Sequence, residues 1–516
     1  MSRSVPAPIR GGGGTGERVD VTEALSGRAG LEGVRWLLLA PAVRRSLRRE
    51  LSALLPSSEL LGPCRLYRAK FKPGRKLKAY YNASLGNVPG NFRSVAVEWV
   101  PDALGDVGPD AGPSEMEAEA IDAGLAAPFQ RLQAGDHKLG TRISVSPLDP
   151  RYRQLVRVST PEHARAMVAR ACSGGGAAHA GGPVGSYAVT TIRYRPGERH
   201  VLRYDPVDDD GARSGEGTIF AKLYRDGEGA RAWSDATQIA DWLEPTEGIQ
   251  AARPLGYLPD DEVILYPRVT GTPLSNFLRR ARGTAAVHLE RAGAALRHLH
   301  ETPVELTGKL PRHEFAAEIK AIARASEHVE PLLPSASEGI ARLLERAQEV
   351  EGKMVQEAPT FAHGDYKADH AWVTAAGLTL IDFNTVSLAE PALDVGKFLA
   401  DLQWWYATSG RSGVEWARER FLAGYGADTP PQRLLSARLY EVLILTKITV
   451  RRVRLFDPAW APHTEALIAR ADALLDDLCA LVERGGRASE ANPGAARGTS
   501  GGPDRRARRR AQPAVG

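Results

Sequence analysis

Two aspartates that flank a short hairpin pattern are the residues of this chain with the clearest chemical potential. The stretch Phe361–Asn384 reads FAHGDYKADHAWVTAAGLTLIDFN. Two apolar runs surround a turn at Ala375–Gly377, which is the pattern of a small β-hairpin. The loop before the hairpin contains Asp365, and the second run ends on Asp382. A hairpin of this length brings both carboxylates to one cleft, where they need a cation or a shared proton.

The elements expected to position this stretch include a repeated strand pattern. A strand pair around the turn Lys72–Arg75, followed by a third strand, recurs as a strand pair around Arg195–Glu198 and a third strand. Lining up the two Pro-Gly turns places Glu98 of the first copy at the position of Lys222 in the second. We interpret this as an internal repeat in which only the second copy keeps a basic residue. The alternative is that two unrelated meanders share a common turn.

Apolar periodicity extends this pattern into a plan for the whole chain. The second copy continues with one helix and two short strands, which predicts a small antiparallel sheet with one packed helix, and amphipathic helices dominate from Pro273 onward. The fold class expected is therefore α+β. The predicted parts are a disordered tail at 1–33, an N-terminal α+β domain at 34–172, a linker at 173–185, a small lobe at 186–270, a helical lobe at 271–485 and a disordered Arg-rich tail at 486–516.

Composition narrows the classes of function. With 516 residues, 43% hydrophobic and 25% charged, the chain is long enough for several well-packed domains. The net charge of +5 is carried by the C-terminal tail from Arg487, which lacks interleaved aromatic residues and argues against nucleic-acid binding. Three widely spaced cysteines indicate neither a zinc site nor a disulfide framework and fit a reducing cytoplasm. No segment has the length and hydrophobicity of a signal peptide or membrane span.

A sheet domain with one lysine, followed by a helical domain with HGD and a later IDF, resembles the aminoglycoside phosphotransferase and choline kinase-like family. The motifs are His363-Gly364-Asp365, Ile381-Asp382 and Asp394 in PALDVGKF, and the resemblance covers roughly 185–480. It implies a two-lobed protein-kinase-like fold, to which this chain adds an N-terminal α+β domain resembling a second small lobe. It also implies ATP and Mg²⁺ as cofactors.

The resemblance assigns roles to the residues around the two aspartates. Asp365 would orient the acceptor hydroxyl for in-line attack, and Lys367 would touch the γ-phosphate. Asp382 would offer carboxylate oxygen to Mg²⁺. Asp394, at the start of the following helix, is expected to fix the catalytic loop. His363 is expected to be a buried histidine that stabilises the loop.

The nucleotide anchors are expected in the small lobe. Lys222 would hold the α- and β-phosphates and needs an acid on the following helix, for which Asp235 is the first choice and Glu228 a competitor. No GxGxxG loop is present. The turn with Arg195 and Arg199 would cover the nucleotide instead, with both arginines near phosphate.

The sequence departs from the family at His370, where Asn is usual as a second metal ligand. Imidazole suits Mn²⁺ better than Mg²⁺. Three interpretations stay open: His370 binds a metal such as Mn²⁺, it hydrogen-bonds phosphate or Asp382, or it marks a weakened site. Asp369 could also supply the oxygen ligand.

The resulting hypothesis is an ATP-dependent kinase that phosphorylates a hydroxyl of a small molecule such as an aminoglycoside, a sugar or an amino alcohol. The alternatives are a pseudokinase or regulatory nucleotide-binding module and a kinase acting on peptide hydroxyls. The expected partners are thus a nucleotide and a hydroxylated small molecule, with no membrane.

Overall fold

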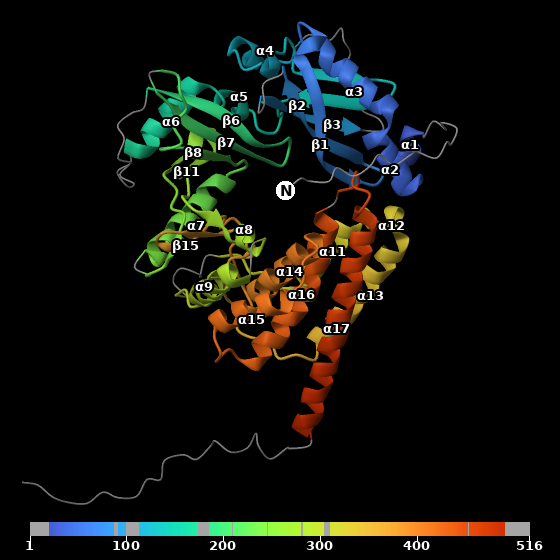
Figure 1. The fold of residues 1–516 in the computed structure, drawn as a ribbon, viewed down its shortest axis with the longest axis vertical. Coiled ribbons are helices and arrows are strands. Elements are labelled where there is room, and N and C mark those ends of the chain that lie inside the picture. Colours follow the sequence, from blue (N-terminus) through green and yellow to red (C-terminus); the bar gives the residue numbers. More distant parts are fainter. Residues whose placement is uncertain are drawn as a thin grey trace, which may run out of the picture.

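The computed structural model has two sheet regions that lie next to each other above a helical region (Figure 1). The fold is α+β, as expected. The description below covers residues 20–86, 91–99, 113–173, 185–208, 210–244, 246–279, 282–303, 310–452 and 454–490. The expected linker lies outside this description at 174–184, as does the tail from 491.

Helices begin earlier than the sequence analysis expected. The residues assigned to a tail up to position 33 include α1 (Val21–Ser26) and the start of α2 (Gly30–Leu39), so that assignment is wrong for residues 20–33. Asp20 caps α1 by accepting a hydrogen bond from the amide of Thr22 at 2.7 Å. Pro41 starts a separate helix, α3 (Pro41–Ala53), directly after α2, with a change of direction at Ala40.

The first sheet is antiparallel, with strand order β1-β2-β3-β5-β4. Its inner face packs against α1–α3, where residues such as Leu51, Phe71 and Trp99 are buried in one core. The elements of this region are η1 (Ser58–Leu60), β1 (Leu61–Lys72), β2 (Lys76–Leu85), β3 (Phe92–Trp99), α4 (Glu115–Asp122), β4 (Gln133–Asp136), β5 (Thr141–Val145), α5 (Gln154–Arg157) and α6 (Pro161–Ser173).

The second sheet has the matching strand order β10-β11-β8-β7-β6. In both sheets a hairpin and a third strand are followed by a helix and then two strands that add beside the third strand in reverse order. The elements are β6 (Ser186–Arg195), β7 (Arg199–Val207), β8 (Ile219–Leu223), α7 (Glu228–Leu243), β10 (Gly256–Leu258), η2 (Pro259–Asp261) and β11 (Val263–Pro267). The shared topology supports an internal repeat over two unrelated meanders.

Strand register confirms the alignment of Glu98 with Lys222. Glu98 pairs with Lys78 on β2, and Lys222 pairs with Val201 on β7. Lys78 and Val201 each lie five residues after the proline of their hairpin turn. Glu98 forms ion pairs with Lys76 at 2.9 Å and Lys78 at 3.5 Å, so the first copy has a carboxylate at the position that Lys222 occupies in the second.

The helical region contains one large core, in which α14 and α16 pack along each other. Its helices are α8 (Leu274–Leu278), α9 (Arg282–His300), α11 (Phe315–Ser326), α12 (Val329–Leu332), α13 (Pro334–Glu351), α14 (Ala392–Thr408), α15 (Val414–Tyr425), α16 (Pro431–Arg451) and α17 (Trp460–Glu490). The tail expected from residue 486 is thus helical up to Glu490. Along the part of the chain described here, no helix has the length and apolar character needed to cross a membrane.

Short strands form the boundary between the second sheet and the helical region. The predicted hairpin is present as β14 (Ala371–Thr374) and β15 (Gly377–Leu380). It belongs to a small sheet with β12 (Thr272–Pro273) and β9 (Ile249–Ala251), and a second pair is formed by β13 (Thr360–Ala362) and β16 (Ser387–Ala389). The loops that carry Asp365 and Asp382 begin where these strands end.

Candidate active site

The structure confirms that the hairpin brings Asp365 and Asp382 into one cleft. Together with His370 they each present a ligand atom, and these three atoms lie within 4.8 Å of one another. Asp382 follows β15 with a φ of 67°, in the left-handed region that costs free energy for a residue other than glycine. This backbone conformation re-aims the chain directly after the strand.

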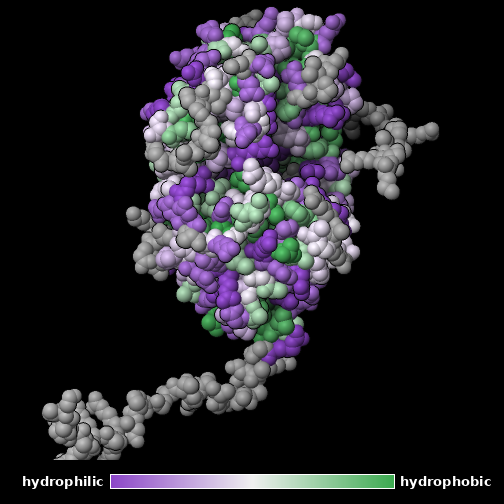
Figure 2. All heavy atoms as spheres, turned by 60° about the vertical axis from the view of Figure 1, so that its left-hand side comes forward, coloured by the Kyte–Doolittle hydropathy of each residue, from purple (hydrophilic) through white to green (hydrophobic). Residues whose placement is uncertain are grey.

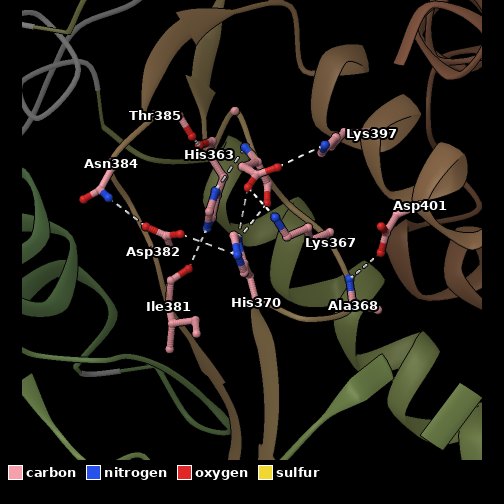
Figure 3. Close-up of polar contacts among 12 residues, drawn as sticks. His363, Lys367, Ala368, His370, Ile381, Asp382, Asn384, Thr385, Lys397 and Asp401 are labelled. Atoms are coloured by element: carbon pink, nitrogen blue, oxygen red, sulfur yellow. Dashed lines mark hydrogen bonds and ion pairs between the residues drawn. The ribbon is translucent and has the colours of Figure 1, made fainter. Parts of the chain in front are cut away.

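The loop before the hairpin is fixed by two buried side chains, as predicted. Asp394 accepts hydrogen bonds from the backbone amides of His363 at 2.6 Å and Gly364 at 2.9 Å. The buried ring of His363 contacts the carbonyl oxygen of Ile381 at 3.2 Å (Figure 3). Gly364 has a φ of 73°, and a Cβ there would lie 2.2 Å from the carbonyl oxygen of Thr385. Only glycine fits this close approach.

Asp365 lies between two lysines. Lys367 donates to Oδ2 at 2.6 Å, and Lys397 of α14 lies 3.0 Å from Oδ1. Burial alone would raise the pKa of Asp365, but Lys397, His370 and Lys367 outweigh it and hold the pKa well below the usual range. The carboxylate is therefore ionised at neutral pH and can accept a hydrogen bond.

His370 is buried between the two aspartates. Its Nδ1 contacts the backbone carbonyl oxygen of Asp365 at 3.0 Å, and because a carbonyl only accepts, Nδ1 carries the proton. Burial lowers the pKa of His370 to about 3, so the ring is neutral at pH 7. Its Nε2 then presents a lone pair toward Oδ2 of Asp382 at 3.6 Å (Figure 3).

This geometry fits a divalent cation. Two electron-rich atoms, Nε2 of His370 and Oδ2 of Asp382, face each other in a buried site, and a cation between them would remove the repulsion. The set of two carboxylates and one imidazole suits an ion that accepts both oxygen and nitrogen ligands, such as Mn²⁺, as well as Mg²⁺ held through the oxygens. Asp369, the other candidate ligand, is not part of this cluster.

Lys222 pairs with Asp382, not with the acid that the sequence suggested. Its Nζ donates to Oδ1 of Asp382 at 2.7 Å. Asp235 instead lies 3.5 Å from Arg231 of its own helix, one turn earlier, so the expected Lys222–Asp235 pair is wrong for this structure. Asp235 and Lys222 still line the same cavity.

Further hydrogen bonds hold Asp382 from the other side. Asn384 donates to Oδ1 of Asp382 at 2.8 Å and accepts a hydrogen bond from the hydroxyl of Tyr224 at 2.9 Å. Burial would raise the pKa of Asp382, but Lys222 and His370 lower it well below its usual range. Lys222 and Asn384 both donate to Oδ1 of Asp382, so Oδ2 is left to face His370.

The two predicted arginines of the β6–β7 turn have different surroundings. Paired residues of neighbouring strands share a face, so Arg195 and Arg199 lie on the same face as Lys222. Arg199 lines the cavity with Lys222. Arg195 is partly buried beside cationic neighbours. Its burial is the main cause that lowers its pKa to about 10, and repulsion from Arg68 and Arg193 adds to this effect. Arg199 is therefore the better placed of the two to meet a phosphate.

Asp365, Lys367, Lys222 and Arg199 all border one cavity of about 820 Å³ between the second sheet and the helical region. The surface between the upper and lower parts is hollowed and rimmed by hydrophilic residues (Figure 2). Sequence reasoning missed Lys397 and Lys447 on this cavity. Lys397 is one helical turn after Asp394, a spacing that could have revealed it, but Lys447 carries no sequence signal beyond its place in an apolar helix.

Comparison with known proteins places this site in a family. Residues 208–440 match the model of a phosphotransferase enzyme family, and the match contains every residue of the Asp365–Asp382 site. This region is similar to the phosphotransferase enzyme family. Lys222, Asp365, His370 and Asp382 all lie within the phosphotransferase-family region, whereas the first sheet and its helices lie before it. No curated protein sequence matches the chain significantly.

Several solved structures resemble the chain, all at low identity. A choline/ethanolamine kinase family protein from Mesorhizobium loti is 16% identical, with coverage of 62% of this chain and 98% of that protein and a TM-score of 0.42. An aminoglycoside phosphotransferase from Streptomyces rimosus, in complex with ADP and streptomycin, is 21% identical, with coverages of 49% and 90% and a TM-score of 0.33. An amicoumacin kinase in complex with AMP-PNP and Ca²⁺ is 14% identical, with coverages of 56% and 88% and a TM-score of 0.37.

Proposed function

We propose that the protein transfers the γ-phosphate of ATP to a hydroxyl group of a small molecule, with Mg²⁺ or Mn²⁺ as the metal. The observation that carries this proposal is the meeting of Asp365, His370, Asp382 and Lys222 in one cleft between a sheet and a helical region. Phosphoryl transfer needs positioning and charge compensation more than covalent chemistry, and this cleft supplies both.

Asp365 orients the acceptor. The hydroxyl donates a hydrogen bond to the ionised carboxylate, which directs its oxygen toward the γ-phosphorus. A bond forms between this oxygen and phosphorus while the bond from phosphorus to the β–γ bridging oxygen breaks. ADP leaves with the bridging oxygen, and the hydroxyl proton passes to Asp365 and from there to solvent. Lys367, 2.6 Å from Asp365, is close enough to contact the transferred phosphate as well.

The nucleotide phosphates would be held by Lys222 and Arg199. Burial lowers the pKa of Lys222, and its ion pair with Asp382 offsets this effect in part. A divalent ion on Asp382 and His370 would compensate charge on the phosphates and on Asp382. Lys222 can then direct its remaining donors toward phosphate oxygens, since an ammonium group has three.

The test is ADP formation by the purified full-length protein with Mg²⁺ or Mn²⁺ and a panel of hydroxylated metabolites. Asp365→Asn should lower kcat by about 10²- to 10⁴-fold, the contribution typical of a general base. Asp477→Asn, on an exposed part of α17, is the charge-matched control and should leave kcat unchanged. Equal activity in Asp365→Asn and wild type would sink the proposal.

The regulatory alternative is favoured by one observation, the imidazole of His370 in the metal cluster. A metal-dependent thermal shift with ATP, together with no turnover on any acceptor, would support a nucleotide-binding module. A ligand at 100 times its Kd adds about 2.7 kcal/mol to stability, which such a shift reports clearly. We also propose a cytoplasmic location, since Cys64, Cys172 and Cys479 are all unpaired thiols.

A further inference from the structure

The wall of the cleft that lies beyond Asp365 is strongly basic. It is formed by Lys397 of α14, Lys447 and Arg451 of α16, and Arg312 in the segment before α11. The same wall also contains the carboxylate of Glu318. The whole cavity lining contains nine lysines and arginines but five carboxylates. This net positive charge is larger than the two positive charges of Lys222 and Arg199.

Only part of this charge is compensated within the protein. Lys447 forms a buried ion pair with Glu318 at 2.6 Å, and Lys397 contacts Asp365 at 3.0 Å. Arg312 and Arg451 have exposed side chains, and within the described residues neither has an ion-pair partner. Burial lowers the pKa of Lys447, its ion pair with Glu318 opposes this shift, and Arg451 and Lys397 lower the pKa by smaller amounts.

The basic lining continues outward from the cleft. A second cavity of about 540 Å³ shares Arg451 and is lined by Arg68, Lys70 and Lys72 of β1 together with Arg324 of α11, against one carboxylate, Glu327. Lys70 is paired with Glu198 at 2.6 Å. A cleft with an excess of one sign of charge attracts ligands of the opposite sign and disfavours those of the same sign. A polycationic acceptor would meet repulsion on this path, whereas an anion would be drawn along it.

We propose that the acceptor is a hydroxylated small molecule that carries a phosphate or carboxylate group, which Arg312 and Arg451 bind while Asp365 orients its hydroxyl. This inference rests on the proposed phosphotransferase function and specifies its substrate class. Arginine is suited to the role because its planar guanidinium binds phosphate and carboxylate through two parallel hydrogen bonds. Lys447 is paired with Glu318, which compensates its charge, so the contacts to the anion are assigned to Arg312 and Arg451.

The test uses acceptors matched in all but charge. ADP formation is measured with ATP and Mg²⁺ or Mn²⁺ on hydroxylated metabolites in sets: a neutral sugar, its phosphate ester, its sugar acid and the corresponding amino sugar. The phosphate and carboxylate arms separate the two sources of the anion. We expect the best acceptor, by kcat/KM, to be anionic, and its KM to rise with ionic strength.

Variants then locate the anion. Arg451→Gln and Arg312→Gln should each raise the KM for the best anionic acceptor about 10- to 100-fold, the range for loss of a hydrogen bond to a charged group. Arg342→Gln, at an exposed position of α13 that does not line the cleft, is the matched control and should leave this KM unchanged. The nucleotide-induced thermal shift is recorded for every variant, so loss of ATP binding is recognised separately.

Each outcome decides the matter. A best acceptor that is neutral or cationic overturns the anionic assignment and leaves the kinase function standing. If no acceptor is turned over but ATP still binds, the anionic members are tested for a thermal shift on protein loaded with a non-hydrolysable ATP analogue, and absence of any shift overturns the assignment. If ATP does not bind at all, the proposed function fails first, and the substrate class fails with it.

Discussion

Asp149, which belongs to the N-terminal region, accepts a hydrogen bond from the backbone amide of Gly197 at 2.6 Å. Gly197 is part of the β6–β7 turn that carries Arg199 into the cleft. The same carboxylate contacts Nε2 of His200 at 2.7 Å, and the carbonyl oxygen of Glu198 accepts a hydrogen bond from the hydroxyl of Tyr152 at 3.0 Å. The first copy of the sheet motif thus helps hold the phosphate-side turn of the second.

Replacing Asp149 should therefore weaken nucleotide binding from outside the cleft. Asp149→Asn keeps the size of the side chain but removes the charge that His200 and the Gly197 amide contact. We expect the Kd for ATP to rise about 2- to 30-fold, the usual range for coupling through a packed network. Titration by thermal shift or calorimetry measures it. Asp122→Asn, exposed on α4 of the same region, should leave the Kd unchanged, and an unchanged Kd in Asp149→Asn would contradict the coupling.

The contact between Gly364 and Thr385 allows a test of loop geometry. Gly364→Ala should lower the unfolding free energy by about 1–3 kcal/mol through backbone strain. It should lower kcat about 100-fold, because the clash with Thr385 displaces Asp365. Gly74→Ala is the matched control: its φ of 67° is similar, but no atom lies within 4 Å of the added Cβ. Gly74→Ala should lower the unfolding free energy by about 1–2 kcal/mol and leave kcat unchanged.

The metal preference should follow the ligand at position 370. His370→Asn replaces an imidazole nitrogen by an amide oxygen, which suits Mg²⁺ better. If His370 binds the metal, the ratio of Mg²⁺-supported to Mn²⁺-supported activity should rise about 10-fold. Initial rates across a titration of each metal give this ratio. An unchanged ratio would mean that His370 acts only through hydrogen bonds.

His328 should make the stability of the protein depend on pH. Burial lowers its pKa from 6.5 to about 4, so the folded state binds the proton less well than the unfolded state. The stabilisation is fully present above pH 6.5 and is lost as the pH falls toward 4. Between pH 7.5 and pH 5 the loss amounts to about 2 kcal/mol. Urea unfolding of His328→Gln should show a smaller decline than wild type, whereas His463→Gln, an exposed histidine, should show the same decline.

Local patterns predicted the site well, because its signals lie close together in the sequence. The β14–β15 hairpin, the convergence of Asp365 and Asp382, and the backbone contacts of Asp394 all depend on short-range chemistry: turn residues, strand ends and a helix start. The alignment of Glu98 with Lys222 was also readable, since the two Pro-Gly turns set the register of both sheets.

Sequence reasoning missed the ion pairs and cleft residues that depend on tertiary packing between segments far apart in the chain. Lys222 pairs with Asp382, 160 residues away, instead of with Asp235 on the next helix. Lys447 reaches the cleft from α16, which is apolar along most of its length, so its position has no periodic signal. The early start of α1 was hidden because its two buried residues, Ala24 and Leu25, give too short an apolar pattern to predict a helix.

The N-terminal region also contacts the helical region, which has a consequence for motion. Arg35 of α2 donates to the carbonyl oxygens of Leu455 at 3.0 Å and Asp457 at 3.1 Å, and Trp460 joins the core of the first sheet. The same region contacts the β6–β7 turn through the hydrogen bond between Asp149 and the Gly197 amide. Because the N-terminal region is attached on both sides of the cleft, the cleft cannot open widely without breaking one of these two sets of contacts. We therefore expect the angle between the second sheet and the helical region to stay nearly constant, so that ligands enter and leave the cleft through small movements of side chains and turns.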